Sequence, residues 1–312
     1  MATHHLDDEH CHAFWDNTLP PRVRIQPGDT VVFETLEASA KQMVPGAPSE
    51  ALATLSFDPI HPLTGPVYVE GAEPGDALVV EVVSLAHKGW GWNAVIPGFG
   101  LLADDFSAPY LHHYELGDDC RFRDDIRIPY EPFCGVMGVG PRENGRFTTI
   151  PPRENGGNMD IRDLVAGSRL LLPVHVPGAM LSIGDLHFAQ GDGEVCIAAI
   201  ETGGTATVRV GVRRDGWRPS LPAWESPARP GRDYFATTGI PLADDGSQGD
   251  LDLNLATRRA LIEMLGYLVS ARGLGREAAY VLMSVAVELR ISEIVDVPNA
   301  LVSALLPLDV FE

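Results

Sequence analysis

The chain has 312 residues, of which 45% are hydrophobic and 21% are charged, and its formal net charge is −20. This length allows a large buried core, in one large domain or in a few modules. Nucleic acids and anionic membrane surfaces bind basic patches, so the acidic balance excludes them as expected partners and favours neutral or cationic ligands. The sequence has no run of roughly 18 apolar residues and no signal-peptide pattern at its N-terminus, so we expect a cytoplasmic protein.

The four cysteines are far apart in the sequence and form no C-x-x-C pair. This spacing is too sparse for a disulfide framework or a structural zinc module. The cysteines are Cys11, Cys120, Cys134 and Cys196, and the last lies in an apolar run that is typical of a small core residue.

Two stretches of alternating apolar residues, 22–37 and 65–85, are each interrupted by a Pro-Gly-Asp triplet. Each stretch predicts two strands joined by a turn, and we expect two hairpins. The repeated triplet is better explained by shared turn chemistry than by an internal repeat. The glycine- and tryptophan-rich stretch 89–102 predicts a loop, and further short strands are expected at 133–140, 168–184, 194–201 and 205–213.

The pattern changes to helical spacing near the C-terminus. Residues 253–272 predict an amphipathic helix with Gly273 as its C-cap. Residues 276–290 predict a second helix, and 297–307 a third, shorter one.

A Pro-, Gly- and Asp-rich connection follows residue 215 and suggests a module boundary. We therefore predict a mainly β fold of sandwich-like or barrel-like modules with a small α+β C-terminal part. Residues 1–215 would form the β-rich body that carries the active site, and residues 216–312 the connection and the helical part.

Residues 184–194 read GDLHFAQGDGE and place several ionisable groups between two strongly apolar runs. Asp185 and His187 are two residues apart, so on a strand both side chains project from the same face. Asp192 and Glu194 repeat this spacing beyond a glycine that allows a tight turn. Buried carboxylates and imidazoles must be paired, protonated or bound to a cation, so these residues are candidates for a functional site.

The structural alternative is that the carboxylates of this stretch face solvent and His187 is an ordinary buried polar residue, because two residues do not define a metal site. Other polar stretches favour one pocket built from several strand ends. These are 151–164 with Asn158 and Asp160, 130–141 with Glu131 and Cys134, and the proline-held turn 61–66 with His61.

Four ordered blocks of the sequence together resemble the acetamidase/formamidase family of amide hydrolases. They are HPLTGPVYVEGAEPGDALVVEV (61–82), PFCGVMGVGP (132–141), GGNMDIRDLVAGSRLLLPVHVPGAMLSIGD (156–185) and HFAQGDGEVCIAAIE (187–201). The resemblance implies a β-rich fold of several modules. It also implies hydrolysis of a small carboxamide, such as formamide or acetamide, to a carboxylate and ammonia.

The resemblance further implies a metal-dependent hydrolase, in which a divalent ion acidifies water and polarises the amide carbonyl. Asp160, Asp185 and His187 offer the nitrogen and oxygen ligands that suit zinc, with calcium and manganese as alternatives. Glu131 or Glu194 would then be the general acid and base.

The remaining candidate residues concern the substrate and a competing mechanism. Asn158 would donate a hydrogen bond to the substrate oxygen. His61, Trp92 and Gln190 are candidate substrate-binding residues. Cys134 is the alternative nucleophile, although a thiolate needs a base or cation that its sequence neighbours do not supply.

Other functions stay open at this level. The chain could hydrolyse a related C–N or ester bond, or could be a non-catalytic β-rich binding protein of the same fold. The polar groups of the glycine-broken stretches are present, which favours an enzyme. We expect a small neutral amide as the partner, and a homo-oligomer, a dimer or larger, built through the apolar run 170–181 or the C-terminal helices.

Overall fold

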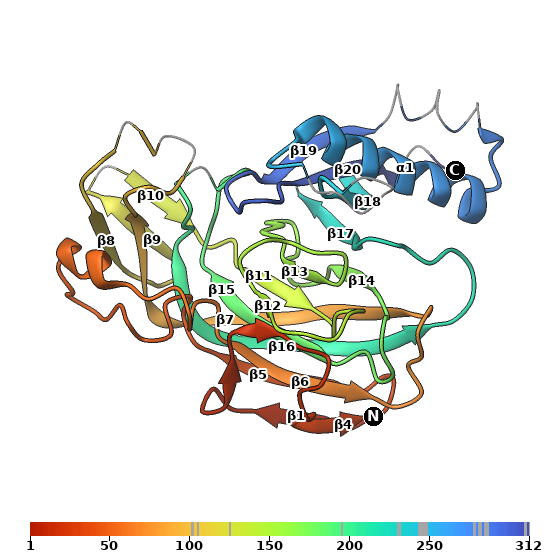
Figure 1. Ribbon diagram of the computed structural model, residues 1–312, viewed down its shortest axis with the longest axis horizontal. Helices are drawn as coiled ribbons and strands as arrows, with labels where there is room; N and C mark the ends of the chain where they lie inside the picture. The colour runs from red at the N-terminus through yellow and green to blue at the C-terminus, as the bar shows by residue number, and fades with distance from the viewer. Residues whose placement is uncertain are drawn as a thin grey trace.

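The computed structural model describes residues 1–100, 103, 104, 106–124, 126–194, 196–229, 232–242, 249–276, 279, 283, 287–308 and 311. A large, mainly antiparallel sheet forms the body, and a long helix, α1 (Leu253–Arg272), packs on its C-terminal strands (Figure 1). The predicted mainly β fold with a small α+β C-terminal part is confirmed. No helix in the described part of the chain is long and apolar enough to cross a membrane.

Strands on the main path across the large sheet are antiparallel to their neighbours. In spatial order they are β13 (Gly156–Asn158), β11 (Phe133–Gly138), β15 (Leu181–His187), β16 (Glu201–Arg213), β7 (Ala77–Val95), β14 (Arg169–Pro173), β17 (Ala223–Arg229), β18 (Arg232–Gly239), β20 (Leu301–Pro307) and β19 (Glu288–Glu293).

Shorter elements attach to this path or lie beside it. On the large sheet they are β1 (Thr3–Leu6), β2 (Cys11–His12), β4 (Val23–Ile25), β5 (Thr30–Thr35), β6 (Leu63–Val69) and β8 (Tyr110–Glu115). The separate pairs are β3 (Phe14–Trp15) with β12 (Phe147–Thr148), and β9 (Asp119–Arg123) with β10 (Ile126–Pro129); a 3₁₀ helix, η1, covers Ser49–Thr54.

The main hydrophobic core joins the strands that carry the candidate residues. Apolar side chains of β6, β7, β11, β14, β15 and β16 pack there, and Phe133, Met137 and Ile183 are almost fully buried. A second core lies under α1, where the Phe235 and Tyr267 rings stack with their centroids 3.8 Å apart. The central strands are therefore buried on both faces, which excludes water from any polar group they carry.

The two Pro-Gly-Asp stretches form strands as predicted, but neither is a hairpin. Strand β4 pairs in parallel with β6, whereas β5 pairs with β1 and β16. The shared turn chemistry is present: Asp29 Oδ2 accepts a hydrogen bond from Gln26 N, and Asp76 Oδ2 accepts one from Glu73 N. The triplet thus makes a tight turn, while tertiary pairing decides which strand lies beside which.

The first C-terminal helix is confirmed, since α1 begins after the Asp252 N-cap and ends at Gly273, whose φ is 69°. The third predicted helix is wrong, because Leu301–Pro307 is the buried strand β20. The second predicted helix, 276–290, lies partly outside the described residues, and from Glu288 onward the chain is strand β19. A short apolar run buried on both faces has no periodicity that distinguishes strand from helix.

Two other predicted strands differ from the structure. The run 168–184 contains two strands, β14 and β15, separated by a turn in which Ala179 and Met180 have positive φ. The described residues of 194–200 form turns and bends rather than a strand, and Glu194 and Ile197 have φ values of 45° and 77°, outside the β region.

The sheet continues across the predicted boundary at residue 215. Strand β17 pairs with β14, so the C-terminal strands extend the same sheet. The division into 1–215 and 216–312 stays a prediction, and residues from both ranges meet at the site described next.

Candidate active site

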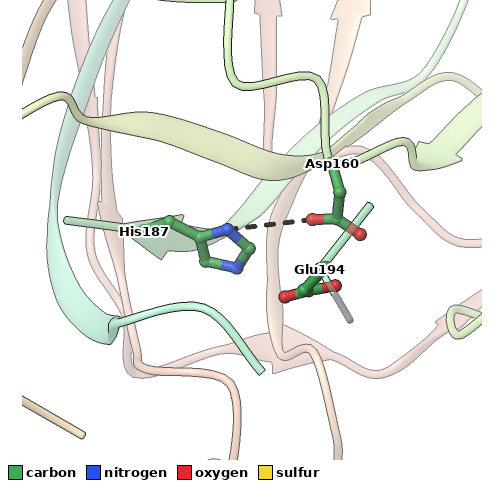
Figure 2. A group of neighbouring side chains, drawn as sticks. All are labelled: Asp160, His187 and Glu194. Atoms are coloured by element: carbon green, nitrogen blue, oxygen red, sulfur yellow. Dashed lines mark ion pairs between the residues drawn. The ribbon is translucent and has the colours of Figure 1, made fainter. Parts of the chain in front are cut away.

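His187, the last residue of β15, is the centre of a buried cluster of carboxylates. Its side chain is 1% exposed, and its Nε2 atom lies 3.2 Å from both Asp185 Oδ2 and Glu201 Oε2. Its Nδ1 atom lies 3.7 Å from Asp160 Oδ1, and Glu194 lies beside Asp160 (Figure 2). Four acidic residues therefore surround one imidazole in the protein interior.

Neighbouring strands bring these residues together. Asp185 and His187 lie on the same strand, as their spacing predicts, and Glu201 begins β16 directly opposite His187. Asp160 follows β13, which pairs with β11 on the other side of β15. Glu194 lies in the turn that leads from β15 to β16. The cluster forms because β15 is an interior strand and the segments around it each contribute a carboxylate.

Backbone strain is concentrated at this site. Non-glycine residues with φ in the left-handed region include His61 at 53°, Asp160 at 47°, Asp185 at 55° and Glu194 at 45°. Each such conformation costs on the order of 1–3 kcal/mol and persists only where the surrounding structure enforces it. Four of them around one cluster indicate a functional constraint.

Gly135 of β11 leaves room for the cluster. A Cβ atom on this residue would lie 2.5 Å from Asp160 Oδ1, 2.6 Å from Asp185 Oδ2 and 2.8 Å from His187 Cε1. The backbone carbonyl of Gly135 also accepts a hydrogen bond from Asp160 N, at 3.3 Å. Any side chain at position 135 would therefore displace the groups around the imidazole.

The electrostatics of the cluster follow from burial and mutual charge. Burial raises the pKa of Asp160 and of Glu201 to about 7, and that of Glu194 well above its usual range. Burial alone would raise the pKa of Asp185 too, but the charges of His187 and His61 outweigh it and hold that pKa below its usual value. For His187, burial opposes the charged form, yet Glu201 and Asp185 raise its pKa well above normal.

Many buried polar atoms of the cluster make no hydrogen bond within the described residues. They are both carboxylate oxygens of Asp160, Asp185 Oδ1, Glu201 Oε2 and both ring nitrogens of His187. Orphaned buried polar atoms are costly unless a further group binds them. An imidazole nitrogen with several carboxylate oxygens is a donor set that suits zinc and other divalent ions, so these residues fit a metal ion.

Two overlapping triads can hold such an ion: Asp160, His187 and Glu194, and Asp185, His187 and Glu201. In each triad the candidate ligand atoms lie within 4.8 Å of one another. A neutral imidazole has one nitrogen without a proton, and this nitrogen would bind the ion together with the carboxylates of one triad. The N–H of the other nitrogen would then donate a hydrogen bond to a carboxylate of the second triad. The predicted ligands Asp160, Asp185 and His187 thus span both triads.

A cavity of ≈ 400 Å³ opens beside the cluster. Its polar lining includes Asp185, Glu194 and Glu201, and its apolar lining includes Ile60, Ile96 and Phe99. A cavity of this size, mostly apolar with a few convergent polar groups, is typical of a small-molecule site. Three further residues predicted from the sequence also line it: His61, Trp92 and Asn158.

Trp92 belongs to the end of strand β7, so the predicted loop 89–102 is strand as far as Val95. Its Nε1 atom donates a hydrogen bond to Glu37 Oε2 at 2.9 Å, which fixes the indole at the cavity wall. Residues 96–100 follow as a turn along the same wall, and residues 101 and 102 lie outside the described residues.

Two predicted residues lie on a different cavity, of ≈ 480 Å³, which shares only part of its wall with the first. Glu131 is half-exposed and forms an ion pair with Arg162 at 2.6 Å. Gln190 donates a hydrogen bond to the backbone carbonyl of Asp160, at 3.2 Å. Glu194 lines both cavities, so of the two predicted acid/base residues it is the one that borders the cluster.

Cys134 is buried in the main hydrophobic core, 2% exposed, and strand alternation directs it away from the face on which Gly135 meets the cluster. Burial raises the pKa of its thiol to about 12. A group with this pKa is almost entirely protonated at neutral pH, so Cys134 is a poor nucleophile.

Sequence reasoning missed three acidic residues at the site. Glu201 ends the apolar run VCIAAIE, and its position opposite His187 depends on strand register. Glu293 ends β19, and Asp296 lies in the connection from β19 to β20. Burial raises the pKa of Glu293 to about 8 and that of Asp296 well above normal. The available signal was the presence of isolated acids within apolar C-terminal sequence.

The β-rich fold, the adjoining cavity and a buried imidazole and carboxylate cluster that could hold a metal ion define a candidate hydrolase. A family description for acetamidases and formamidases matches residues 2–146 and 143–312. The chain therefore belongs to the acetamidase/formamidase family, and the predictions of this family and of an amide hydrolase are confirmed.

Individual relatives agree with this assignment over nearly their full length. The chain is 32% identical to a formamidase of Methylophilus methylotrophus, over 98% of this chain and 90% of that protein. A crystal structure of an acetamidase from Bacillus halodurans matches with a TM-score of 0.88 and 32% identity, covering 98% of both chains. A γ-lactamase from Delftia acidovorans matches with a TM-score of 0.66 and 28% identity, over 100% of this chain and 94% of that one.

Proposed function

We propose that this chain hydrolyses a small primary carboxamide, with water adding to the carbonyl carbon and the C–N bond breaking to give a carboxylate and ammonia. The observation that carries the proposal is the cluster around His187 at the wall of a cavity of ≈ 400 Å³. Formamidase and acetamidase relatives, which are similar over most of the chain, support the substrate class.

A divalent ion, with zinc the first choice, would be held by His187 and the carboxylates of one of its two triads. When bound, such an ion supplies Lewis acidity, which polarises a carbonyl oxygen and lowers the pKa of water. Calcium and manganese are alternatives, because carboxylate oxygens dominate the donor set.

Glu194 and Glu201 are the candidate proton carriers, since both line the cavity beside Asp185. Each belongs to one triad, so the glutamate outside the triad that holds the ion would carry the proton. Burial raises the pKa of Glu194 well above normal, which favours the protonated carboxyl that a donor to the departing nitrogen needs. Glu201, with a pKa raised to about 7, is suited to accept a proton from the attacking water.

The similarity to a γ-lactamase favours a cyclic amide as the second candidate substrate class. The reacting group is the same, and only the shape of the apolar cavity wall would discriminate between the two.

Cytoplasmic location and a homo-oligomeric state are also part of the proposal. All four cysteines are free thiols, as expected of a reducing compartment. Light scattering coupled to size-exclusion chromatography tests the oligomer, and a single-chain mass would overturn it.

The test of function is ammonia release from formamide, acetamide and an aryl-acetamide, together with ring opening of a γ-lactam to its amino acid. The protein is assayed as isolated, after chelation, and after return of zinc, manganese or calcium. Loss on chelation and recovery with one ion support the proposal, and absence of turnover with the metal retained overturns it. Glu194→Gln should lower kcat by about 100-fold or more, whereas Glu131→Gln should leave it within about threefold.

A further inference from the structure

The connection between β19 and β20, residues 294–300, forms one wall of the site cavity although it is distant from the cluster in sequence. Three contacts hold this region of the chain in place. Gly193 N donates to Ser292 O at 3.1 Å, Asn299 Nδ2 donates to Pro152 O at 2.8 Å, and Asn158 Nδ2 donates to Asp296 Oδ2 at 2.6 Å. The third contact joins two residues that both line the cavity.

Asn158 is 3% exposed, and its hydrogen bond to Asp296 orients its amide group. With Nδ2 donating to Asp296 Oδ2, the Oδ1 atom is buried and accepts no hydrogen bond from the described residues. A buried acceptor without a donor is costly, and the cavity is where a ligand can supply one. In this orientation Oδ1 is the amide atom left for a ligand, whereas the sequence predicted that Asn158 would donate.

Asp296 is itself held rigidly. Glu293 Oε2 accepts hydrogen bonds from both Val295 N and Asp296 N, each at 3.0 Å, and Glu293 is fully buried. Glu293 therefore fixes the turn that carries Asp296. The side chain of Asp296 contacts Asn158 whether or not a substrate is bound. A preorganised acceptor of this kind gives specificity. A ligand without a donor leaves the buried acceptor unpaired, and this lowers the affinity of the site for that ligand.

We propose that Asn158 Oδ1 accepts a hydrogen bond from the N–H of the substrate carboxamide, with Asp296 as the positioning residue that sets this orientation. The inference rests on the proposed amidase function. It adds that Asn158 Oδ1 recognises the substrate nitrogen by its N–H. An ester of the same shape places an oxygen lone pair where the amide has its N–H, so the site selects amides over esters.

The test compares kcat/KM for acetamide and methyl acetate in the metal-loaded enzyme. Asn158→Ala should lower the value for acetamide by about 100-fold and that for methyl acetate by less than about threefold. Asp296→Leu should lower the amide-to-ester ratio by about 10-fold or more. Asp296→Asn should preserve the ratio, because its side-chain oxygen can still accept from Asn158 Nδ2.

Asn155→Ala is the matched control, since Asn155 is a buried asparagine of the same segment whose Nδ2 donates to Val139 O. Its ratio should equal that of the wild type, whatever its stability. Parallel loss of both activities in Asn158→Ala would overturn the inference and leave the amidase function standing. A wild-type enzyme that hydrolyses no amide would instead overturn the proposed function, and the inference with it.

Discussion

Gly135 and Asp160 approach so closely that a Cβ atom on Gly135 would lie 2.5 Å from Asp160 Oδ1. Real Cβ atoms do not tolerate such a distance, and the atoms in the way belong to the buried cluster. The absence of a side chain at position 135 is therefore a structural requirement of the site.

Replacing Gly135 with alanine should disrupt the cluster while leaving the fold intact. We expect Gly135→Ala to lower kcat/KM by about 100-fold or more, because the new methyl group displaces Asp160 and Asp185 together. Gly191→Ala is the matched control, since nothing lies within 4 Å of its Cβ position. Circular dichroism checks the fold, and full activity of Gly135→Ala would contradict this account of the site.

Metal content should depend on His187. Since both candidate triads share this residue, His187→Ala should remove most of the bound divalent ion, as measured by elemental analysis of purified protein. His175→Ala is the control, because His175 is also a buried histidine but lies outside both triads. Equal metal content in the two variants would exclude the proposed centre.

Loss of the Cys134 thiol should have little effect on turnover. The side chain lies in the hydrophobic core and burial raises its pKa to about 12, so Cys134→Ala should keep kcat/KM within about threefold. Incubation with a thiol-alkylating reagent should likewise leave the native enzyme active. A folded variant with a loss of 100-fold or more would restore the cysteine mechanism.

The stability of the metal-free protein should fall as pH rises. Burial raises the pKa of Glu293 from 4.5 to about 8, so between these values the folded state binds more protons than the unfolded state. The stabilisation is complete below about pH 4.5 and is lost as pH rises through 8. The pKa values of Asp160 and Glu201 are also raised, to about 7, so their contributions to stability are likewise lost as pH rises.

Urea unfolding at pH 5 and pH 8 measures this effect. The free energy of unfolding should fall by a few kcal/mol, to an order of magnitude, and Glu293→Gln should reduce the difference. Glu288→Gln changes an exposed carboxyl on the same strand and should not. A difference that is identical in both variants would assign the pH dependence to other groups.

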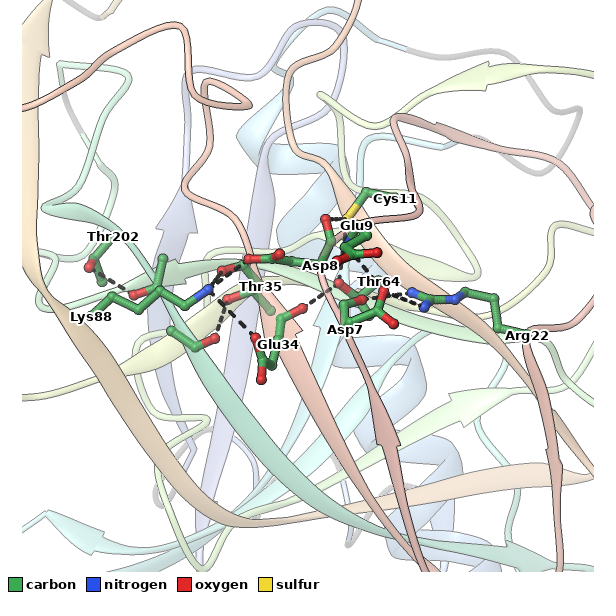
Figure 3. Close-up of polar contacts among 12 residues, drawn as sticks. Asp7, Asp8, Glu9, Cys11, Arg22, Glu34, Thr35, Thr64, Lys88 and Thr202 are labelled. Atoms are coloured by element: carbon green, nitrogen blue, oxygen red, sulfur yellow. Dashed lines mark hydrogen bonds and ion pairs between the residues drawn. The ribbon is translucent and has the colours of Figure 1, made fainter.

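A surface network near the N-terminus should contribute little by comparison. Lys88 Nζ lies 2.7 Å from Asp8 Oδ2 and 3.9 Å from Glu34 Oε2 (Figure 3). Because these groups are solvent-accessible and screened, Lys88→Ala should lower the free energy of unfolding by at most about 1 kcal/mol. Thermal unfolding at low and high salt checks this, and a larger loss that is independent of salt would contradict it.

Local sequence determined the elements whose signals are local. The α1 helix follows from its apolar spacing and from caps at Asp252 and Gly273, and the turns at Asp29 and Asp76 follow from the Pro-Gly-Asp triplet. The spacing of Asp185 and His187 on one strand was equally readable, since alternation is a property of the strand itself. Ordered sequence blocks also identified the family.

Tertiary structure alone decided which residues meet. Glu201 joins the cluster through its register opposite His187, and Asp296 reaches Asn158 across 138 positions of sequence. The sequence predicts a donor role for Asn158, and the acceptor role proposed above depends on its partner Asp296, which only the fold supplies. The physical reason is that strand pairing and burial are properties of the assembled sheet. Spacing along the chain therefore predicts neither which group a polar side chain will contact nor whether that side chain will be removed from water.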